Sequence, residues 1–237
     1  MKKTIFTVIS LVFAGVCSAS DVNDVNKTIE KLNKAAANLR NLTAKIEYTH
    51  NQTLFDTQTL RTGELFYSKD ANNAFLRINF QTLKQDQSVL QQYKEDYIFD
   101  GRKLLRVDYQ SKSYVSEQYS TDKAIEPFEL VQDYFPIVGL AKPQEITQEF
   151  ESSLTNGMLK LVPKESSRFF KAYTQVNVTI DPNLNLPVTF NAATTDNEEI
   201  TIRLTNIEIS KPVGKQVFEP QIPADFVRTE KKPQGQN

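Results

Sequence analysis

Regular alternation of apolar and polar residues dominates the second half of the chain. It runs through residues 170–180, 186–190 and 199–209, and a Pro-flanked stretch at 217–226 reads as a closing short strand. Because successive side chains of a strand point to opposite faces, this pattern predicts a sheet with one polar and one apolar face. The apolar face must be covered by other parts of the chain or must bind something, and this choice defines the functional question.

The first 20 residues have the pattern of a secretory signal peptide. Lys2 and Lys3 open the chain, an apolar run follows, and small residues surround position 19. The apolar run is too short for a membrane-spanning helix. We expect cleavage after Ala19 or Ser20 and export to a bacterial periplasm. A retained N-terminal anchor, or a lipid attached to Cys17, is the alternative.

The composition argues against several classes of function. Charges of both signs are spread along the chain, with a formal net charge of −1, so no basic surface for nucleic acid is indicated. The single histidine, His50, has no nucleophile paired with it in the sequence, and no His or Cys pair has the spacing of a zinc site. We therefore expect no enzyme, no metal and no cofactor, although an unrecognised pair of carboxylates would allow a hydrolase.

Helical and strand-like periodicities divide the remainder of the chain. Residues 21–39 repeat apolar side chains at spacings of three and four, which predicts an amphipathic helix. Asp100-Gly101 between two alternating stretches predicts a tight hairpin. The further strands are expected at residues 42–48, 63–67, 75–80, 96–99, 103–109, 114–119, 145–150 and 158–162.

Residues 126–140 are too apolar for a solvated loop. Pro127 suits the first turn of a helix, and Pro136 is expected to break or kink it. This segment fits a helical insertion that lies over the sheet, either as core or as a lid.

These elements predict a mainly β (α+β) fold in one domain, residues 21–228. We expect a single curved antiparallel sheet of about 10–11 strands, forming an unclosed half-barrel over the N-terminal helix and the middle helical lid segment. The polar residues 229–237 predict a disordered tail.

A half-barrel that two helical segments fill only in part could hold an acyl chain or an apolar peptide. The alternative is that its aromatic residues form an ordinary core. The residues expected in the cavity wall are Phe80, Tyr97, Phe99, Leu105 and Val107, and those expected in the covering segment are Phe128, Val131, Tyr134, Phe135 and Val138.

Several short motifs, in order, resemble the LolA-like family of periplasmic carriers of outer-membrane lipoproteins over nearly all of residues 22–228. The matching stretches are the helix-to-strand junction at 39–46, Gly-Glu-Leu-Phe-Tyr at 63–67, Asp-Gly at 100–101, Leu-Lys-Leu-Val-Pro-Lys at 159–164, Leu-Pro at 186–187 and Phe-Glu-Pro-Gln-Ile-Pro at 218–223.

The resemblance implies a monomeric carrier that binds lipoprotein acyl chains, or another lipid, in an apolar cavity. It also implies an inner-membrane exporter and an outer-membrane receptor as partners. The chain departs from the family at residues 68–74, where carriers of the best-known type have a Lys-Arg-Pro-like turn whose Arg holds the lid; Lys69 is the nearest cation here. A non-catalytic envelope sensor or protein-binding module on the same fold is the alternative function.

Overall fold

The computed structural model describes residues 19–119, 125–132 and 134–231. The predicted signal peptide therefore lies outside the described residues except for its last two positions. Within the described ranges, no helix combines the length and the apolar character needed to cross a membrane.

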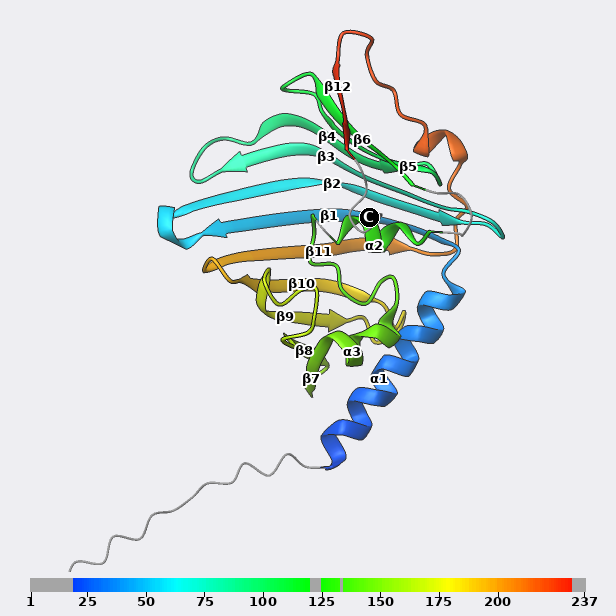
Figure 1. The fold of residues 1–237 in the computed structure, drawn as a ribbon, viewed down its shortest axis with the longest axis vertical. Helices are drawn as coiled ribbons and strands as arrows, with labels where there is room; N and C mark the ends of the chain where they lie inside the picture. Colours follow the sequence, from blue (N-terminus) through cyan, green and yellow to red (C-terminus); the bar gives the residue numbers. More distant parts are fainter. Residues whose placement is uncertain (1–18, 120–124, 133, 232–237) are drawn as a thin grey trace, which may run out of the picture.

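A single sheet of twelve strands forms the body of the molecule (Figure 1). Its order is β12-β6-β5-β4-β3-β2-β1-β11-β10-β9-β8-β7, so β12 and β7 are the two edge strands, and the barrel stays open because they do not pair with each other. All neighbouring strands are antiparallel except β12 and β6, which are parallel. The strands are β1 Asn41–Gln52, β2 Thr57–Lys69, β3 Ala74–Gln85, β4 Gln91–Phe99, β5 Lys103–Asp108, β6 Ser113–Gln118, β7 Phe150–Thr155, β8 Met158–Pro163, β9 Tyr173–Ile180, β10 Pro187–Thr194, β11 Glu198–Glu208 and β12 Val227–Lys231.

Within the described ranges, three α-helices and three short 3-10 helices accompany the sheet. The predicted amphipathic helix is present as α1, and it buries Val25, Ile29 and Leu32 against the rest of the core. It lies beside the β7 edge in Figure 1 and contacts β7 and η2. The helices are α1 Ala19–Asn38, α2 Pro127–Val131, α3 Ile146–Glu149, η1 Thr53–Phe55, η2 Pro143–Glu145 and η3 Lys215–Phe218.

The predicted hairpin at Asp100-Gly101 joins β4 to β5. Gly101 has a φ of +94°, which a residue with a Cβ rarely adopts. The Asp100 carboxylate accepts hydrogen bonds from the backbone N–H groups of Arg102 (2.9 Å) and Lys103 (2.8 Å). This turn therefore forms for the reason that the sequence indicates.

A second glycine fixes the register between β2 and β3. The pairing shifts by one residue between Thr62 and Gly63, and a Cβ on Gly63 would lie 1.8 Å from the backbone oxygen of Asn79. Only glycine fits this close approach of two strands.

The two faces of the sheet are buried by different parts of the chain. The inner face carries the main core, to which β1 contributes Leu42, Ala44, Ile46 and Tyr48. On the outer face a smaller cluster of Ile98, Leu105 and Val107 packs against Ile222 and Phe226 of the C-terminal arm, which we define as residues 209–226.

Leu105 and Val107 therefore do not lie in the inner wall, and that prediction is wrong. Leu104 faces inward and pairs with Phe99, whereas Leu105 pairs with Ile98 on the outer face. Because Leu104 and Leu105 are adjacent, the sequence does not show which of them faces inward. The arm covers the outer face here, so apolar residues are buried on both faces of this strand.

Other predictions also differ from the structure. Residues 145–149 form the end of η2 and α3, and only Phe150 of the expected strand is in a strand, as the first residue of β7. Residues 217–226 form the end of η3 and irregular chain. Residues 229–231, the start of the expected disordered tail, belong to β12, which pairs in parallel with β6 and extends to Lys231. The half-barrel itself is confirmed, with twelve strands in place of about 10–11.

Candidate functional site: the covered inner face

Residues 126–140, which we call the cover, pack against the inner face of the sheet. Residue 133 lies outside the described residues. The cover starts with α2, in which Pro127 occupies the first turn, and continues as irregular chain after Val131. Its buried hydrophobic side chains are Phe128, Val131, Phe135, Ile137, Val138 and Leu140. The helix was expected to break at Pro136, but it already ends at Val131.

An aromatic cluster joins the cover to the sheet. The Phe135 ring lies 4.9 Å from the Tyr97 ring, 5.8 Å from Tyr48 and 6.0 Å from Phe80, measured between ring centroids. Tyr134 adds a contact of 5.4 Å with Tyr97. Edge-to-face and tilted rings at these distances attract each other beyond the burial of their area. The aromatic contacts of the cover are therefore made with strands β1, β3 and β4.

A buried ion pair lies at the margin of this cluster. The Arg61 guanidinium donates to the Glu95 carboxylate at 2.5 Å and lies over the rings of Tyr48 (4.4 Å) and Phe80 (4.8 Å). Glu95 also accepts hydrogen bonds from the hydroxyls of Tyr93 and Tyr97, both at 3.0 Å. Burial, and then Glu95, raise the pKa of Tyr93 to about 12, so this hydroxyl stays protonated and donates.

The start of the cover is held by Glu126. Its carboxylate accepts from the Lys69 ammonium and from the Tyr67 hydroxyl, each at 3.2 Å. The Tyr67 ring in turn stacks on Phe128 at 4.9 Å. Burial raises the pKa of Glu126, although Lys69, Tyr67 and the Phe128 N–H act in the opposite direction. The carboxylate is therefore held in place at a cost in desolvation.

This contact concerns the departure from the family at residues 68–74. The sequence indicated Lys69 as the cation nearest to the position of the family's Arg. In the structure Lys69 does reach the first residue of the cover, as a single ion pair in place of the fork of an arginine.

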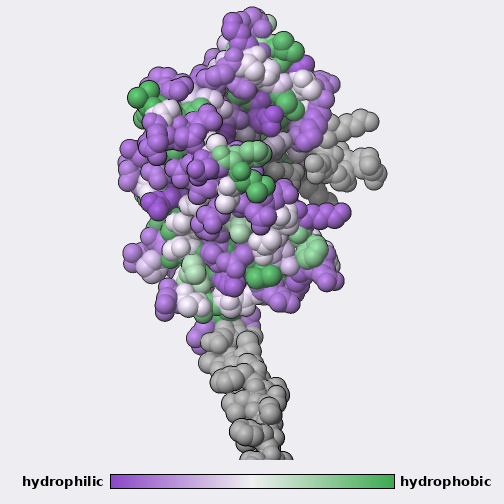
Figure 2. Space-filling model, turned by 90° about the vertical axis from the view of Figure 1, so that its left-hand side faces the viewer, coloured by the Kyte–Doolittle hydropathy of each residue, from purple (hydrophilic) through white to green (hydrophobic). Residues whose placement is uncertain are grey.

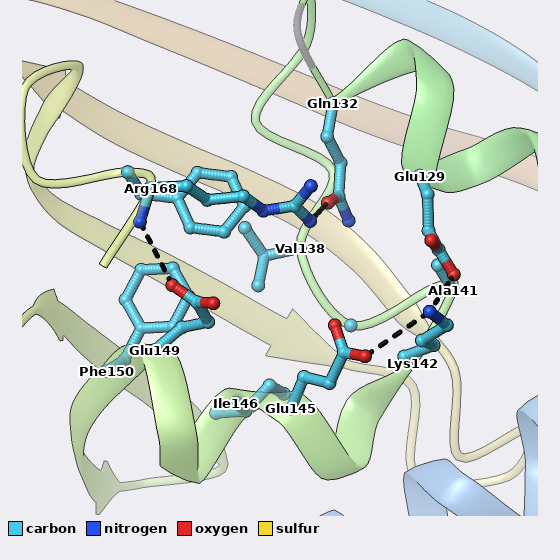
Figure 3. Close-up of a pocket in the computed structure, with 12 residues that line it drawn as sticks. Glu129, Gln132, Val138, Ala141, Lys142, Glu145, Ile146, Glu149, Phe150 and Arg168 are labelled. Atoms are coloured by element: carbon cyan, nitrogen blue, oxygen red, sulfur yellow. Dashed lines mark hydrogen bonds and ion pairs between the residues drawn. The ribbon is translucent and has the colours of Figure 1, made fainter. Parts of the chain in front are cut away.

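Polar contacts also hold the middle of the cover at its edges. Arg168 donates to the Gln132 side chain at 2.6 Å, and the Tyr134 hydroxyl donates to Glu117 at 3.0 Å. Lys142 pairs with Glu129 at 2.9 Å (Figure 3). The cover is thus apolar towards the sheet and polar along its rim.

The pocket in Figure 3 lies between the cover and α3, with Val138, Ile146, Phe150 and Phe169 among its apolar lining. Its cavity volume is about 20 Å³. A water molecule needs about 10–15 Å³ on this measure, so this cavity is too small for an acyl chain. A larger hollow of about 310 Å³ lies between α1 and the start of the cover, with Tyr67, Lys69 and Glu126 among its lining residues. Phe80 and Phe135 are at most 1% exposed, so a ligand reaches them only if the cover moves.

The structure brings eight of the ten predicted site residues together. Phe80, Tyr97, Phe99, Phe128, Val131, Phe135 and Val138 are buried in the main core, and Tyr134 packs against it. Leu105 and Val107 lie on the outer face. Whether the eight contact a ligand stays a prediction.

Sequence reasoning missed the charged members of the site, Arg61 and Glu95. The sequence does indicate where these charges lie. Arg61 is an even number of residues from Leu65 and Tyr67, and Glu95 is an even number of residues from Tyr97 and Phe99. Alternation alone would place both charges on the inner face. Two opposite charges that face inward, one on β2 and one on β4, indicate an ion pair.

His50 has a structural partner. Its Nε2 lies 2.7 Å from a Glu198 carboxylate oxygen, and Gln52 donates to the other oxygen at 3.0 Å. These contacts tie β1 to the start of β11. In the described part of the chain, no group of three or more His, Cys, Asp or Glu residues could hold a metal ion.

No family model matches the chain, and no curated protein matches it in sequence. Solved structures do match in fold. MucB is 12% identical with a TM-score of 0.50, over 86% of this chain and 66% of the MucB chain. An uncharacterized conserved protein from Thermus thermophilus is 8% identical with a TM-score of 0.49, over 88% of this chain and 99% of that chain. A LolA superfamily protein from Nitrosomonas europaea is 9% identical with a TM-score of 0.35, over 83% and 97% of the two chains.

At these identities the likeness is one of fold. The chain spans about two thirds of the MucB chain. The fold predicted from the sequence is confirmed by the architecture itself, an unclosed and mainly antiparallel sheet wrapped over helices.

Proposed function

We propose that the chain is a non-catalytic periplasmic carrier. It shields an acyl chain of a lipoprotein, or of another lipid, beneath the sheet where the cover now lies, and delivers it towards the outer membrane. The observation that carries this proposal is the construction of the cover. Its apolar side fills an aromatic inner face, and polar contacts at its rim hold it there.

Exchange of the cover for an acyl chain keeps the inner face covered, and its main cost is exposure of the cover's own apolar side chains unless these pack on the bound acyl chain. The apolar groups of the inner face stay away from water, at about 25 cal/mol per Å² of buried apolar surface, whichever of the two lies against them. The rim groups Lys69, Glu126 and Arg168 can bind water once the cover moves, so breaking their contacts costs little net hydrogen bonding. A densely packed segment built this way can be displaced.

The partners of such a carrier follow from the resemblance. We propose that an inner-membrane exporter loads the chain and an outer-membrane receptor unloads it, and that the chain acts as a monomer after loss of residues 1–20.

An uncharged fluorescent acyl ester tests the proposal. We expect the exported chain to bind one probe, with a blue-shifted emission that reports an apolar site. Lys69→Met removes the cation from Glu126 and should speed uptake, because the buried carboxylate then loses its partner. Lys112→Met is the matched control, since Lys112 forms an exposed pair with Asp225 of the arm at 3.1 Å and not with a residue of the cover.

Equal uptake rates for the Lys69→Met and Lys112→Met variants would contradict the role of the rim contact. Absence of probe binding by the unmodified chain would reject the carrier.

The alternative is a protein-binding module on the same fold. The close packing of the cover on the sheet favours it, because Phe80, Phe128 and Phe135 are at most 1% exposed in the closed state. In that case the chain binds no acyl probe, and substitutions in the cover change only its stability.

A further inference from the structure

Two turns with exposed apolar side chains lie at one end of the sheet, away from the cover. The turn between β1 and β2 exposes Leu54 (77%) and Phe55 (71%), and the turn between β3 and β4 exposes Val89 (79%) and Leu90 (59%). Both turns point to the same side in Figure 1. Figure 2 looks onto this side, where hydrophobic groups stand among hydrophilic ones.

These apolar turns differ from other turns of the sheet. The turns at residues 70–73, 100–102 and 110–112 consist of polar residues, glycine and alanine. Exposed Phe, Leu and Val on a turn gain nothing from folding, because they meet water in the folded and the unfolded chain alike. A group of them on neighbouring turns is typical of a contact surface.

The two turns are fixed to each other by hydrogen bonds. The Gln58 backbone N–H donates to the Asp86 carboxylate at 2.7 Å, and the Asp86 N–H donates to the Gln58 carbonyl at 2.8 Å. Both turns also contain a residue with a left-handed backbone, Asp56 (φ 50°) and Asp86 (φ 51°). The four apolar side chains are thus presented on a preformed frame, which lowers the entropic cost of binding.

A hollow of about 520 Å³ lies beside these turns, and its charge selects the partner. Three of its nine lining residues are the acids Asp56, Asp86 and Glu199, and the other six are Asn, Gln or Thr. Among the described residues, no Lys or Arg lines it. Carboxylates without a cation repel an anionic lipid surface and attract Lys and Arg side chains.

We propose that this end of the sheet docks a partner protein through a segment that combines Lys or Arg with apolar side chains. The apolar residues of that segment pack on Leu54, Phe55, Val89 and Leu90, and its cations enter the acidic hollow. This surface is separate from the inner face, so the carrier proposal and the docking proposal can fail independently.

A labelled peptide of alternating Leu and Lys residues is the probe. We expect it to bind the full exported chain, to lose affinity at high salt, and to bind much more strongly than a Leu and Glu peptide of equal length. Two variants should each weaken binding by about tenfold or more: Phe55→Ser with Leu90→Ser, and Asp56→Asn with Glu199→Gln.

Matched controls come from exposed residues elsewhere on the chain. Phe170→Ser and Glu208→Gln change an exposed apolar and an exposed acidic side chain away from these turns and should leave peptide binding unchanged. Binding of the acyl probe should stay the same in every variant, which separates this test from that of the carrier.

Three results would overturn the docking proposal. The first is no binding of the Leu and Lys peptide, and the second is equal loss of binding in the control variants. The third is binding of vesicles of phosphatidylcholine and phosphatidylglycerol that depends on Phe55 and Leu90, which would make the surface a membrane contact.

Discussion

Replacement of Phe135 by alanine tests whether residues 126–140 form a cover that can be displaced or an ordinary part of the core. The Phe135 side chain is 1% exposed, and its ring contacts the rings of Tyr48, Phe80 and Tyr97. Loss of a buried phenylalanine ring costs about 3–5 kcal/mol in packing. If the cover leaves the sheet before an acyl chain enters, the loss of this packing energy shifts the equilibrium between closed and open cover towards the open state.

The expected gain in apparent affinity follows from this number. Each 1.4 kcal/mol corresponds to about tenfold in an equilibrium constant, so a loss of about 3 kcal/mol makes opening about 100-fold easier. Apparent affinity rises with the fraction of open molecules until it reaches the intrinsic affinity. Phe135→Ala should therefore unfold at lower urea and yet bind the acyl ester more tightly.

Phe218→Ala is the matched control. Phe218 is also a buried phenylalanine, at 2% exposed, but it lies in η3 and its ring contacts Phe75 at 5.6 Å rather than the cluster. Its loss should lower stability by a similar amount without a gain in affinity. The reasoning is refuted if titration with the acyl ester gives the same affinity for both variants and for the unmodified chain.

Three further substitutions test individual contacts. Gly63→Ala should lower the calorimetric unfolding temperature by several degrees, because the new Cβ would meet the Asn79 carbonyl at 1.8 Å, and an unchanged temperature would count against the close approach. Glu95→Gln leaves the buried Arg61 charge without its carboxylate and should cost about 3 kcal/mol in urea unfolding, so a stability equal to that of the original chain would contradict the ion pair. Burial raises the pKa of Glu126, so the closed cover is most stable below the ordinary pKa of 4.5 and loses this stability as the pH rises through the raised value. Uptake of the acyl ester should thus become easier with rising pH in that window, and Glu126→Gln should abolish the dependence; a variant that keeps the full pH dependence would assign it to another group.

Local chemistry explains why much of the fold could be predicted from the sequence. The 100–101 turn forms because Gly101 accepts a positive φ and Asp100 caps the following N–H groups. The alternation on β1 and β3 matches their inward side chains, because on these strands the two faces differ in polarity.

Where both faces of a strand are buried, alternation does not assign the facing. On β4 the residues 95–99 are all buried, and on β5 the arm covers Leu105 and Val107. The facing of these strands depends on residues 209–226, which are more than a hundred positions away. Tertiary contact of this kind is not encoded in a local pattern.

The errors at residues 145–150 and 229–231 have similar origins. Residues 146–149 make one short helical turn after Pro143, where a strand pattern of equal length fits the sequence as well. The polar β12 forms because the arm delivers it to the free edge of β6, not because of its own propensity.

The site was predicted in its apolar part and missed in its polar part. Hydrophobic runs indicate the cover and the rings that it meets. The pairing of Lys69 with Glu126 joins positions 57 residues apart, and only the packing of the cover against β2 brings them together.

Native mass spectrometry, with lipid extraction, of the protein purified from its own cell envelope tests the central claim most directly. The carrier account predicts a bound acylated lipoprotein or lipid at about one per chain, and it predicts that the unloaded protein takes up the acyl ester. A mass equal to that of the unliganded chain, together with no uptake of the ester, would contradict it and would favour the protein-binding module.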